Sequence, residues 1–309
     1  MKVITKEEFD NFPVVDGYKQ CPSGDYSKIT LFQDRCTFGD NCLFGSFSIF
    51  IRKCLFGKKC IFGDDCNFIQ HCSFGSNCSF CQYCYFGKYC KFGECCSFGE
   101  GCGFYTGCSF GSNCSFWKCC NFGKVCSFGK GCIFRSYCSF SMCCDFGKYS
   151  RFGESCNFGK CCKFDECCIF GEFCSFEKKC ILGQEGNFER FCSFGESCVF
   201  DDRCNFGEGC SFGKGCIFSE CKIGQDSSFG DGCIFEGKCI FENGHVAKDK
   251  SPLLTFSGFG YVNRTIYFFN CEDGIWVRYR TFFGTIEQFK ERFKYYLMIS
   301  DFVENNWGK

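Results

Sequence analysis

The sequence predicts an all-β solenoid, and three observations carry that prediction. From Cys36 to Gly244 a six-residue unit, Cys-x-Phe-Gly-x-x, occurs 35 times almost without interruption. Its first position is Cys in 31 units, and its third position is Phe in 33 units. Because residues two apart share one face of an extended strand, the Cys and Phe side chains point to the same side. No unit can bury its Phe alone, so we expect the units to stack as coils.

The remaining positions of the unit predict where each strand ends. Position 4 is usually Gly, whereas positions 2, 5 and 6 vary among Ser, Asn, Lys, Glu and Asp. Since Gly permits backbone conformations that a residue with a Cβ resists, we expect a corner after every Phe. The three- and four-residue spacing of apolar residues that an amphipathic helix needs is missing from the unit.

Taken from its Phe, the unit Phe-Gly-x-x-Cys-x resembles the hexapeptide repeat of left-handed β-helices. The likeness covers about two thirds of the chain. It departs from that family in using Phe for the aliphatic residue and Cys for the small residue. The resemblance implies a left-handed parallel β-helix of triangular cross-section, with three units per coil and therefore about 12 coils. Relatives with this repeat are often trimers, so a homo-oligomer is left open.

Residues 1–23 break the pattern, and we expect them to form an N-terminal cap. Thr5 and Glu8 have the spacing of a capping box, Phe9 and Phe12 follow, and Pro13 stops the helix. The solenoid is expected over 24–244. A single unit, from Cys216 to Glu220, is one residue short. Because Cys and Phe resume at once after it, the loss belongs at a corner and not within a strand.

After Gly244 the repeat stops, and 245–252 is interpreted as a linker. The segment 253–309 predicts a small ββα module. Its two strands, 265–269 and 275–279, are joined by a turn that contains Asp273-Gly274, a strong hairpin signal. Thr285 and Gln288 predict a second capping box. The apolar face of the following helix is expected to comprise Ile286, Phe289, Phe293, Tyr296 and Leu297.

This tail resembles a small module at the C-termini of phage and prophage repeat proteins. The residues that carry the likeness are Arg264-Thr265, Asp273-Gly274 and Phe283-Gly284-Thr285, followed by Phe289. The resemblance implies a phage- or prophage-related protein made in an infected or lysogenic bacterial host. A plain C-terminal cap is the alternative.

Composition restricts the partners and the compartment. Lys+Arg and Asp+Glu are both 35, so the net charge is zero, which disfavours nucleic-acid binding. No apolar run is long enough to cross a membrane, and the N-terminus has no signal-peptide core. We therefore expect a reducing cytoplasm. The 39 cysteines are an odd number, and position 1 is interpreted as a small hydrophobic site.

Catalysis is not predicted, and no catalytic or cofactor-binding residue is assigned. Many hexapeptide proteins are acyltransferases that use a histidine, but the two histidines here, His71 and His245, have no Ser or carboxylate placed beside them by the repeat. No long loop interrupts the units to form a pocket. Ice binding is disfavoured too, because a regular Thr row is missing from position 2.

A thiol-rich metal or cluster site is the alternative hypothesis. Zinc, copper(I) and iron–sulfur clusters all accept Cys ligands. The closely spaced Cys78, Cys81 and Cys84 are one candidate set, and Cys143 and Cys161, 18 residues apart, are another. The Phe rings that share the interior leave little room for ions.

The leading hypothesis is a non-catalytic structural or interaction protein. Five aromatic residues at position 6 are separated by multiples of 18, so they are expected to share one triangular face of the rod. Exposed aromatic rows often mark partner surfaces. The predicted interaction residues for a protein partner are Phe47, Tyr83, Tyr137, Phe173 and Phe191.

Overall fold

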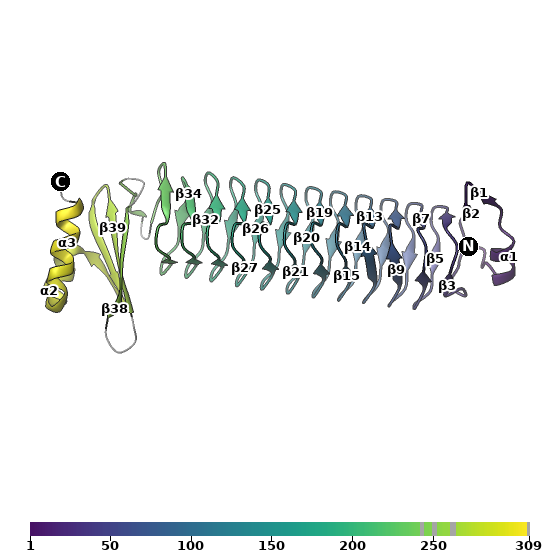
Figure 1. Ribbon diagram of the computed structural model, residues 1–309, viewed down its shortest axis with the longest axis horizontal. Coiled ribbons are helices and arrows are strands. Elements are labelled where there is room, and N and C mark those ends of the chain that lie inside the picture. Colours follow the sequence, from purple (N-terminus) through teal and green to yellow (C-terminus); the bar gives the residue numbers. More distant parts are fainter. Residues whose placement is uncertain (242–243, 249–251, 260–263, 308–309) are drawn as a thin grey trace.

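The protein is a straight rod of three parallel sheets, capped at each end by a different structure (Figure 1). The computed structural model describes residues 1–241, 244–248, 252–259 and 264–307. It confirms the predicted parallel β-solenoid, in which each strand pairs with the strand one coil later. The left-handed sense of the coil stays a prediction from the family resemblance.

The strands of the solenoid fall into three sheets, named A, B and C. Sheet A contains β5 (Leu43–Phe44), β8 (Ile61–Phe62), β11 (Ser79–Phe80), β14 (Ser97–Phe98), β17 (Ser115–Phe116), β20 (Ile133–Phe134), β23 (Arg151–Phe152), β26 (Ile169–Phe170), β29 (Asn187–Phe188), β32 (Asn205–Phe206) and β35 (Lys222–Ile223). Sheet B contains β1 (Val14–Val15), β2 (Tyr18–Cys21), β4 (Cys36–Phe38), β7 (Leu55–Phe56), β10 (Ser73–Phe74), β13 (Lys91–Phe92), β16 (Ser109–Phe110), β19 (Ser127–Phe128), β22 (Asp145–Phe146), β25 (Lys163–Phe164), β28 (Ile181–Leu182), β31 (Val199–Phe200), β34 (Ile217–Ser219) and β37 (Ile234–Glu236). Sheet C contains β3 (Leu31–Phe32), β6 (Ile49–Phe50), β9 (Asn67–Gln70), β12 (Tyr85–Lys88), β15 (Gly103–Phe104), β18 (Asn121–Phe122), β21 (Ser139–Phe140), β24 (Asn157–Phe158), β27 (Ser175–Phe176), β30 (Ser193–Phe194), β33 (Ser211–Phe212) and β36 (Ser228–Phe229).

The interior consists of three columns of stacked Phe rings. Within a column the rings of adjacent coils are parallel, as for Phe110 and Phe128, whose centroids lie 4.8 Å apart at 3°. Between columns the rings meet edge to face, as for Phe110 and Phe116 at 5.1 Å and 86°. Both arrangements suit the quadrupole of the ring. The Phe at position 3 therefore fixes the spacing both along and across the rod.

Position 1 does more than supply a small apolar side chain. The buried thiol at this position donates a hydrogen bond to the carbonyl at the corner of the preceding coil, as Cys114 does to Gly93 at 3.4 Å. Where Ser replaces Cys, the hydroxyl turns to the corner of its own coil, as in Ser150, which donates to the Gly147 carbonyl at 2.7 Å. A buried carbonyl without a donor is costly, so the site selects a small residue that is also a donor.

The corners correct the expected role of Gly at position 4. The left-handed backbone conformation lies at position 6, where φ is 59° for Val125 and 65° for Tyr137. Where Gly stands at position 4, the preceding coil leaves little room for a Cβ, although other units carry larger residues there, such as Tyr105 and Trp117. A Cβ on Gly147 would lie 2.8 Å from the backbone of the preceding coil at Gly129 and Lys130. The short unit also behaves as expected: Glu220 has φ 49° at the corner, and Cys221 and Ile223 return to the interior.

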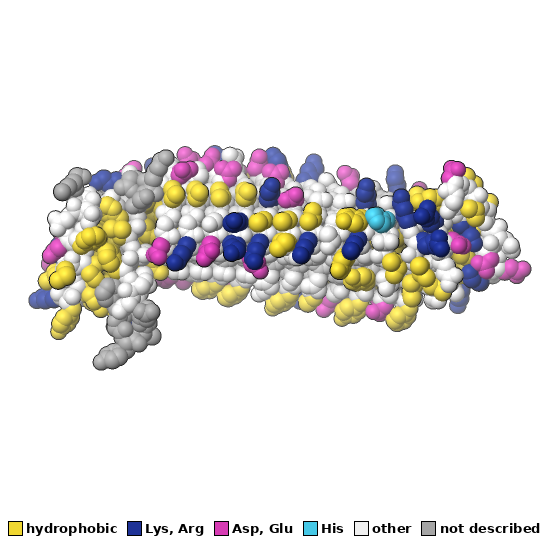
Figure 2. All heavy atoms as spheres, viewed as in Figure 1, with side chains coloured by type: hydrophobic (Ala, Val, Ile, Leu, Met, Phe, Trp, Pro, Cys, Tyr) yellow, Lys and Arg dark blue, Asp and Glu magenta, His cyan; other side chains and the backbone are white. Residues whose placement is uncertain are grey.

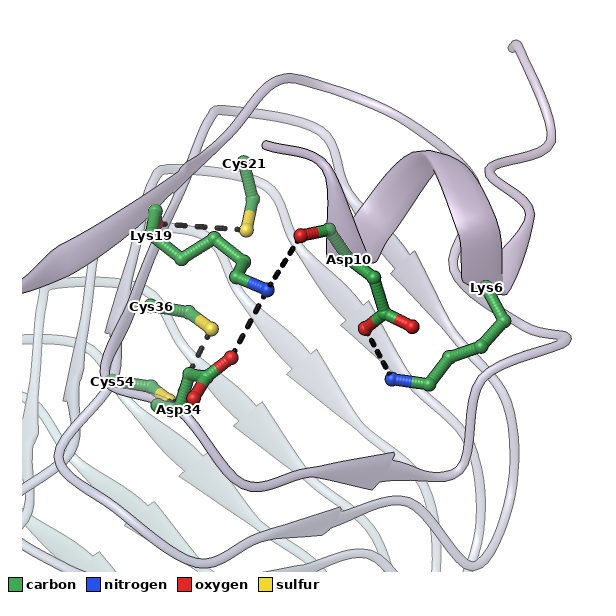
Figure 3. Close-up of polar contacts among 7 residues, drawn as sticks. All are labelled: Lys6, Asp10, Lys19, Cys21, Asp34, Cys36 and Cys54. Carbon is green, nitrogen blue, oxygen red and sulfur yellow. Dashed lines mark hydrogen bonds and ion pairs between the residues drawn. The ribbon is translucent and has the colours of Figure 1, made fainter. Parts of the chain in front are cut away.

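The N-terminal cap contains the predicted helix and an additional hairpin. In α1 (Lys6–Asp10), Thr5 Oγ1 accepts from the Glu8 N–H, and Glu8 accepts from the Thr5 N–H. β1 and β2 form an antiparallel hairpin, and β2 already stacks on β4, so the coils begin before residue 24. Figure 3 shows Lys19 joining the two parts: its Nζ lies 3.0 Å from Asp34 and 3.3 Å from the Asp10 carbonyl. The same ammonium lies 4.6 Å from the Phe9 ring centre.

The C-terminal region differs from the prediction in three ways. First, 245–252 is not a free linker, because Val246 and Ala247 bridge to Ile240 of the solenoid and to Cys271 of the next sheet; 249–251 lie outside the described residues. Second, sheet D has four antiparallel strands and not two: β38 (Leu253–Phe259), β39 (Arg264–Cys271), β40 (Gly274–Tyr279) and β41 (Phe282–Thr285). Third, the helical region is broken into α2 (Ile286–Arg292), a 3-10 turn, η2 (Lys294–Tyr296), and α3 (Leu297–Trp307). The predicted Thr285 and Gln288 capping box is present.

Sheet D closes the open end of the solenoid. Phe269 and Cys271 on one side of the sheet join the solenoid core, whereas Ile266, Phe268 and Val277 form a second core with the helices. Because α2 ends at Arg292, the expected single helical face is interrupted, and Leu297 is exposed. The guanidinium of Arg278, which is buried, donates to the Ser227 carbonyl of the last complete coil.

Candidate functional site

The cysteines proposed as metal ligands do not come together. Cys78 and Cys84 immediately precede β11 of sheet A and β12 of sheet C, and their thiols donate to the carbonyls of Gly57 at 3.4 Å and Gly63 at 3.3 Å. Cys81 is exposed at the corner between them. Cys143 and Cys161 are exposed one above the other at a second corner. Within the described ranges, no three His, Cys, Asp or Glu side chains converge in a way that could hold a metal ion.

Burial makes the Cys168 thiol a poor nucleophile and a poor ligand. Cys168 lies between Ser150 and Gly186 in its column, so the effect of burial is seen there without a neighbouring thiol. Burial raises the pKa of Cys168 to about 12, from about 9 for an ordinary thiol. Because the thiolate is the reactive form, this thiol stays protonated and unreactive at neutral pH.

The two histidines have structural neighbours. The exposed His71 stacks on Tyr89, with ring centres 5.2 Å apart. His245 Nδ1 lies 2.7 Å from an Asp273 carboxylate oxygen, and its ring stacks on Trp276 at 3.7 Å. The second arrangement attaches the end of the solenoid to the β39–β40 turn.

The five predicted interaction residues share one corner, between sheets A and C, and not a flat face. Each has a left-handed backbone, with φ from 56° to 65°. Their exposed fractions range from 45% to 66%. The rings lean toward the next coil: Phe173 stacks on Phe191 at 5.3 Å, and the Tyr83 ring covers Gly101. We call Phe47, Tyr83, Tyr137, Phe173 and Phe191 the aromatic column.

Charge differs between the corners of the rod, a feature that the overall charge balance did not predict. We call position 5 of the corner between sheets C and B the basic edge, and position 5 of the corner between sheets A and C the acidic edge. From Arg52 to Lys179, positions 5 and 6 of the first corner carry seven Lys or Arg and no acid: Arg52, Lys53, Lys88, Lys124, Lys160, Lys178 and Lys179. Figure 2 shows dark-blue side chains in a row along the rod. The acidic edge carries five acids, Asp64, Glu100, Glu154, Glu172 and Glu208, and two bases, Lys118 and Arg190. Summing charge over the whole chain hid this division, which sorting position 5 by its 18-residue spacing reveals.

Sheet C lies between these two edges, and its outer surface has two halves. Toward the N-terminus it exposes an apolar patch. The patch comprises Leu31, Ile49, Ile51, Ile69, Tyr85 and Tyr105. Toward the C-terminus position 2 carries only Asn or Ser. This row comprises Asn121, Ser139, Asn157, Ser175, Ser193, Ser211 and Ser228. A shallow groove of about 520 Å³ lies over part of this row and is lined by Ser139, Asn157 and Lys160 among others.

The fold and these surfaces define a structural β-helix protein. Comparison with known proteins found no matching family model, no similar curated protein and no similar solved structure. No helix in the part of the chain that the structure describes is long and apolar enough to cross a membrane.

Proposed function

We propose that the protein is a non-catalytic rod that binds a protein partner through the aromatic column. The observation that carries this proposal is the position of the five rings. They are half-exposed on one corner, at backbone sites where a bulky residue is unfavourable. The same column uses Gly at 101 and 209, so the fold itself does not require aromatic residues there. Exposed aromatic side chains are typical of the centres of protein interfaces.

The interior supports a structural and not a chemical role. Stacked rings occupy the space that a cofactor would need, and the burial of Cys168 keeps its thiol protonated. All 39 cysteines are free, which fits a reducing cytoplasm. The resemblance of the C-terminal segment to phage modules supports a phage- or prophage-related setting in a bacterial host.

Affinity purification from the producing cells tests the proposal. The double variant Tyr137→Ser, Phe173→Ser should lose a protein that co-purifies with the wild type. The matched control, Tyr89→Ser, Tyr149→Ser, removes exposed rings from the other two corners and should retain it. Equal recovery of the co-purifying protein with the wild type, the double variant and the control would exclude the aromatic column as its binding site. Saturable binding of acetyl-CoA would contradict the non-catalytic assignment.

A further inference from the structure

The two edges that flank sheet C carry charges that match coil by coil. The residues at position 5 on either side of one sheet C strand are six apart in sequence. Five such pairs have opposite charges: Lys28 and Asp34, Glu154 and Lys160, Glu172 and Lys178, Arg190 and Glu196, and Glu208 and Lys214. One pair, Lys118 and Lys124, has like charges. Where Arg190 reverses the sign of the acidic edge, Glu196 reverses the sign of the basic edge in the same coil.

The other two sheets mix like and opposite pairs. Across sheet A, three pairs are like-charged, Glu94 and Glu100, Glu166 and Glu172, and Asp202 and Glu208, and two are opposite, Lys58 and Asp64, and Lys148 and Glu154. Across sheet B, four pairs are like-charged, Asp34 and Asp40, Arg52 and Lys58, Lys124 and Lys130, and Glu196 and Asp202, and three are opposite, Lys88 and Glu94, Lys160 and Glu166, and Lys214 and Glu220. Opposite-charge matching is therefore most consistent across sheet C.

The matched residues do not pair with each other within one chain. Among the described residues, the ion pairs of the corners instead run along the rod, as from Arg190 to Glu172 at 3.6 Å and from Lys214 to Asp231 at 3.9 Å. Pairing along the rod explains alternation within one edge. It does not explain why two edges on opposite sides of a sheet change sign in the same coil.

We propose that two copies of the chain associate side by side and in parallel through their sheet C surfaces. A two-fold axis parallel to the rods places the basic edge of one copy against the acidic edge of the other at the same height. Glu154 then faces Lys160 of the second copy, and Arg190 faces its Glu196. An antiparallel pair, related by a two-fold axis perpendicular to the rods, would place the basic edges of the two copies against each other, and likewise the acidic edges. This inference rests on the proposed function, because the aromatic column borders the same surface.

The rest of the surface fits the same arrangement. In a parallel pair the apolar patch around Ile49 and Tyr85 meets its own copy, and the Asn and Ser row meets its own copy. An antiparallel pair would instead set the apolar patch against the Asn and Ser row, leaving apolar side chains against polar ones. In the parallel pair Phe47 lies next to Arg52 of the second copy, and Tyr83 lies next to its Lys88. Each of these contacts places a cation beside an aromatic ring, as a cation–π interaction requires.

The available area is sufficient. Sheet C has 12 strands, which at about 4.8 Å per strand form a surface about 55 Å long. About five extended residues per side make it about 16 Å wide. The resulting area of roughly 850 Å² per copy is close to the roughly 800 Å² that a standard stable interface buries on each partner.

Sedimentation equilibrium of the full chain under reducing conditions tests the proposal. The wild type should have twice the mass of one chain, and its dissociation constant should rise at least about tenfold between low salt and 1 M salt as the charges are screened. Glu154→Lys with Glu172→Lys should yield a monomer. Adding Lys160→Glu and Lys178→Glu to that variant should restore the dimer. The matched control, Glu94→Lys with Glu166→Lys, alters the corner between sheets B and A, which lies away from sheet C, and should stay dimeric.

Zero-length carboxylate–amine cross-linking of a mixture of isotopically light and heavy wild-type chains tests the orientation. Cross-links between chains should join Glu154 to Lys160 and Glu172 to Lys178. A monomer at all concentrations, or cross-links that involve Glu94 or Glu166 instead, would overturn the inference. Another outcome is a monomeric chain together with a different protein that co-purifies with the wild type and not with the Tyr137→Ser, Phe173→Ser variant. That result would support the proposed function and would reject only the inference that the partner is a second copy of the chain.

Discussion

The solenoid and sheet D are both β-structures with aromatic cores, but they are stabilised differently. In the solenoid most Phe rings have equivalent neighbours, as the 4.8 Å stacking of Phe110 on Phe128 illustrates. In sheet D and its helices each contact is individual: the Tyr279 and Tyr296 hydroxyls lie 3.1 Å apart, and Lys290 binds Glu304 at 2.7 Å. The comparison teaches that a repeated environment is stabilised jointly by many equivalent residues, whereas a cap depends on a few unique ones.

The largest expected difference between the two regions is in their response to alkali, because buried thiols are concentrated in the solenoid, whereas the sequence of sheet D contains Cys271 alone, whose pKa burial also raises to about 12. The pKa of Cys168 is raised by burial from about 9 to about 12, so its stabilising contribution is complete below pH 9 and is lost as pH rises toward 12. Each thiol that ionises only in the unfolded chain costs about 1.4 kcal/mol per pH unit. Chemical unfolding followed by circular dichroism should show the free energy of unfolding fall above pH 9, by about 1.4 kcal/mol per pH unit from Cys168 alone. A free energy of unfolding that is constant between pH 8 and 10.5 would contradict this.

A core ring in the middle of the rod should come next. Phe128→Ala removes one member of a continuous column and should cost about 3–5 kcal/mol. Because coils contact only their neighbours, hydrogen exchange should increase in the flanking coils and much less in sheet D. Tyr137→Ala, on the surface at the corner, is the control and should change stability by about 0.5 kcal/mol or less. Uniformly faster exchange along the chain would show that the two regions unfold as one unit.

The N-terminal cap should show a smaller and local effect. Lys19→Met keeps the apolar contact with Phe9 but removes the ion pair to Asp34 and the cation–π contact, so a loss of about 1–3 kcal/mol is expected. Hydrogen exchange should increase near Cys21 and Phe38 only. Lys6→Met removes the exposed pair with Asp10 and should cost at most about 0.5 kcal/mol. Equal effects of the two changes would exclude the role assigned to Lys19.

The smallest effect is expected for a conservative change inside the repeat. Cys114→Ser keeps a small donor, as Ser150 already does in another coil, and should cost less than about 1 kcal/mol. Cys114→Ala removes the donor and should cost about 1–2 kcal/mol more, measured by urea unfolding. If the Cys114→Ala variant were as stable as the Cys114→Ser variant, the hydrogen bond to the Gly93 carbonyl would contribute nothing to stability, and position 1 would be a purely apolar site.

The sequence predicted most where one environment recurs. The six-residue period placed Cys and Phe inside, and the capping boxes at Thr5 and Thr285 identified two helix starts. It failed where contacts are not periodic: β38 and β41 of sheet D, the bridging of Val246 and Ala247, and the break after Arg292. It also assigned the wrong reason to Gly at position 4, because the close approach of Gly147 to the preceding coil depends on stacking and cannot be inferred from one unit.

A stacked rod with Phe and Cys inside follows from the repeat alone, since a two-residue alternation within a six-residue period admits few other ways to bury them. Three features required the folded chain: the Cys114 thiol donates to another coil, Arg278 reaches the end of the solenoid, and sheet C lies between a basic and an acidic edge. These features depend on which coils and corners are adjacent in space, and adjacency of that kind arises only when the coils stack.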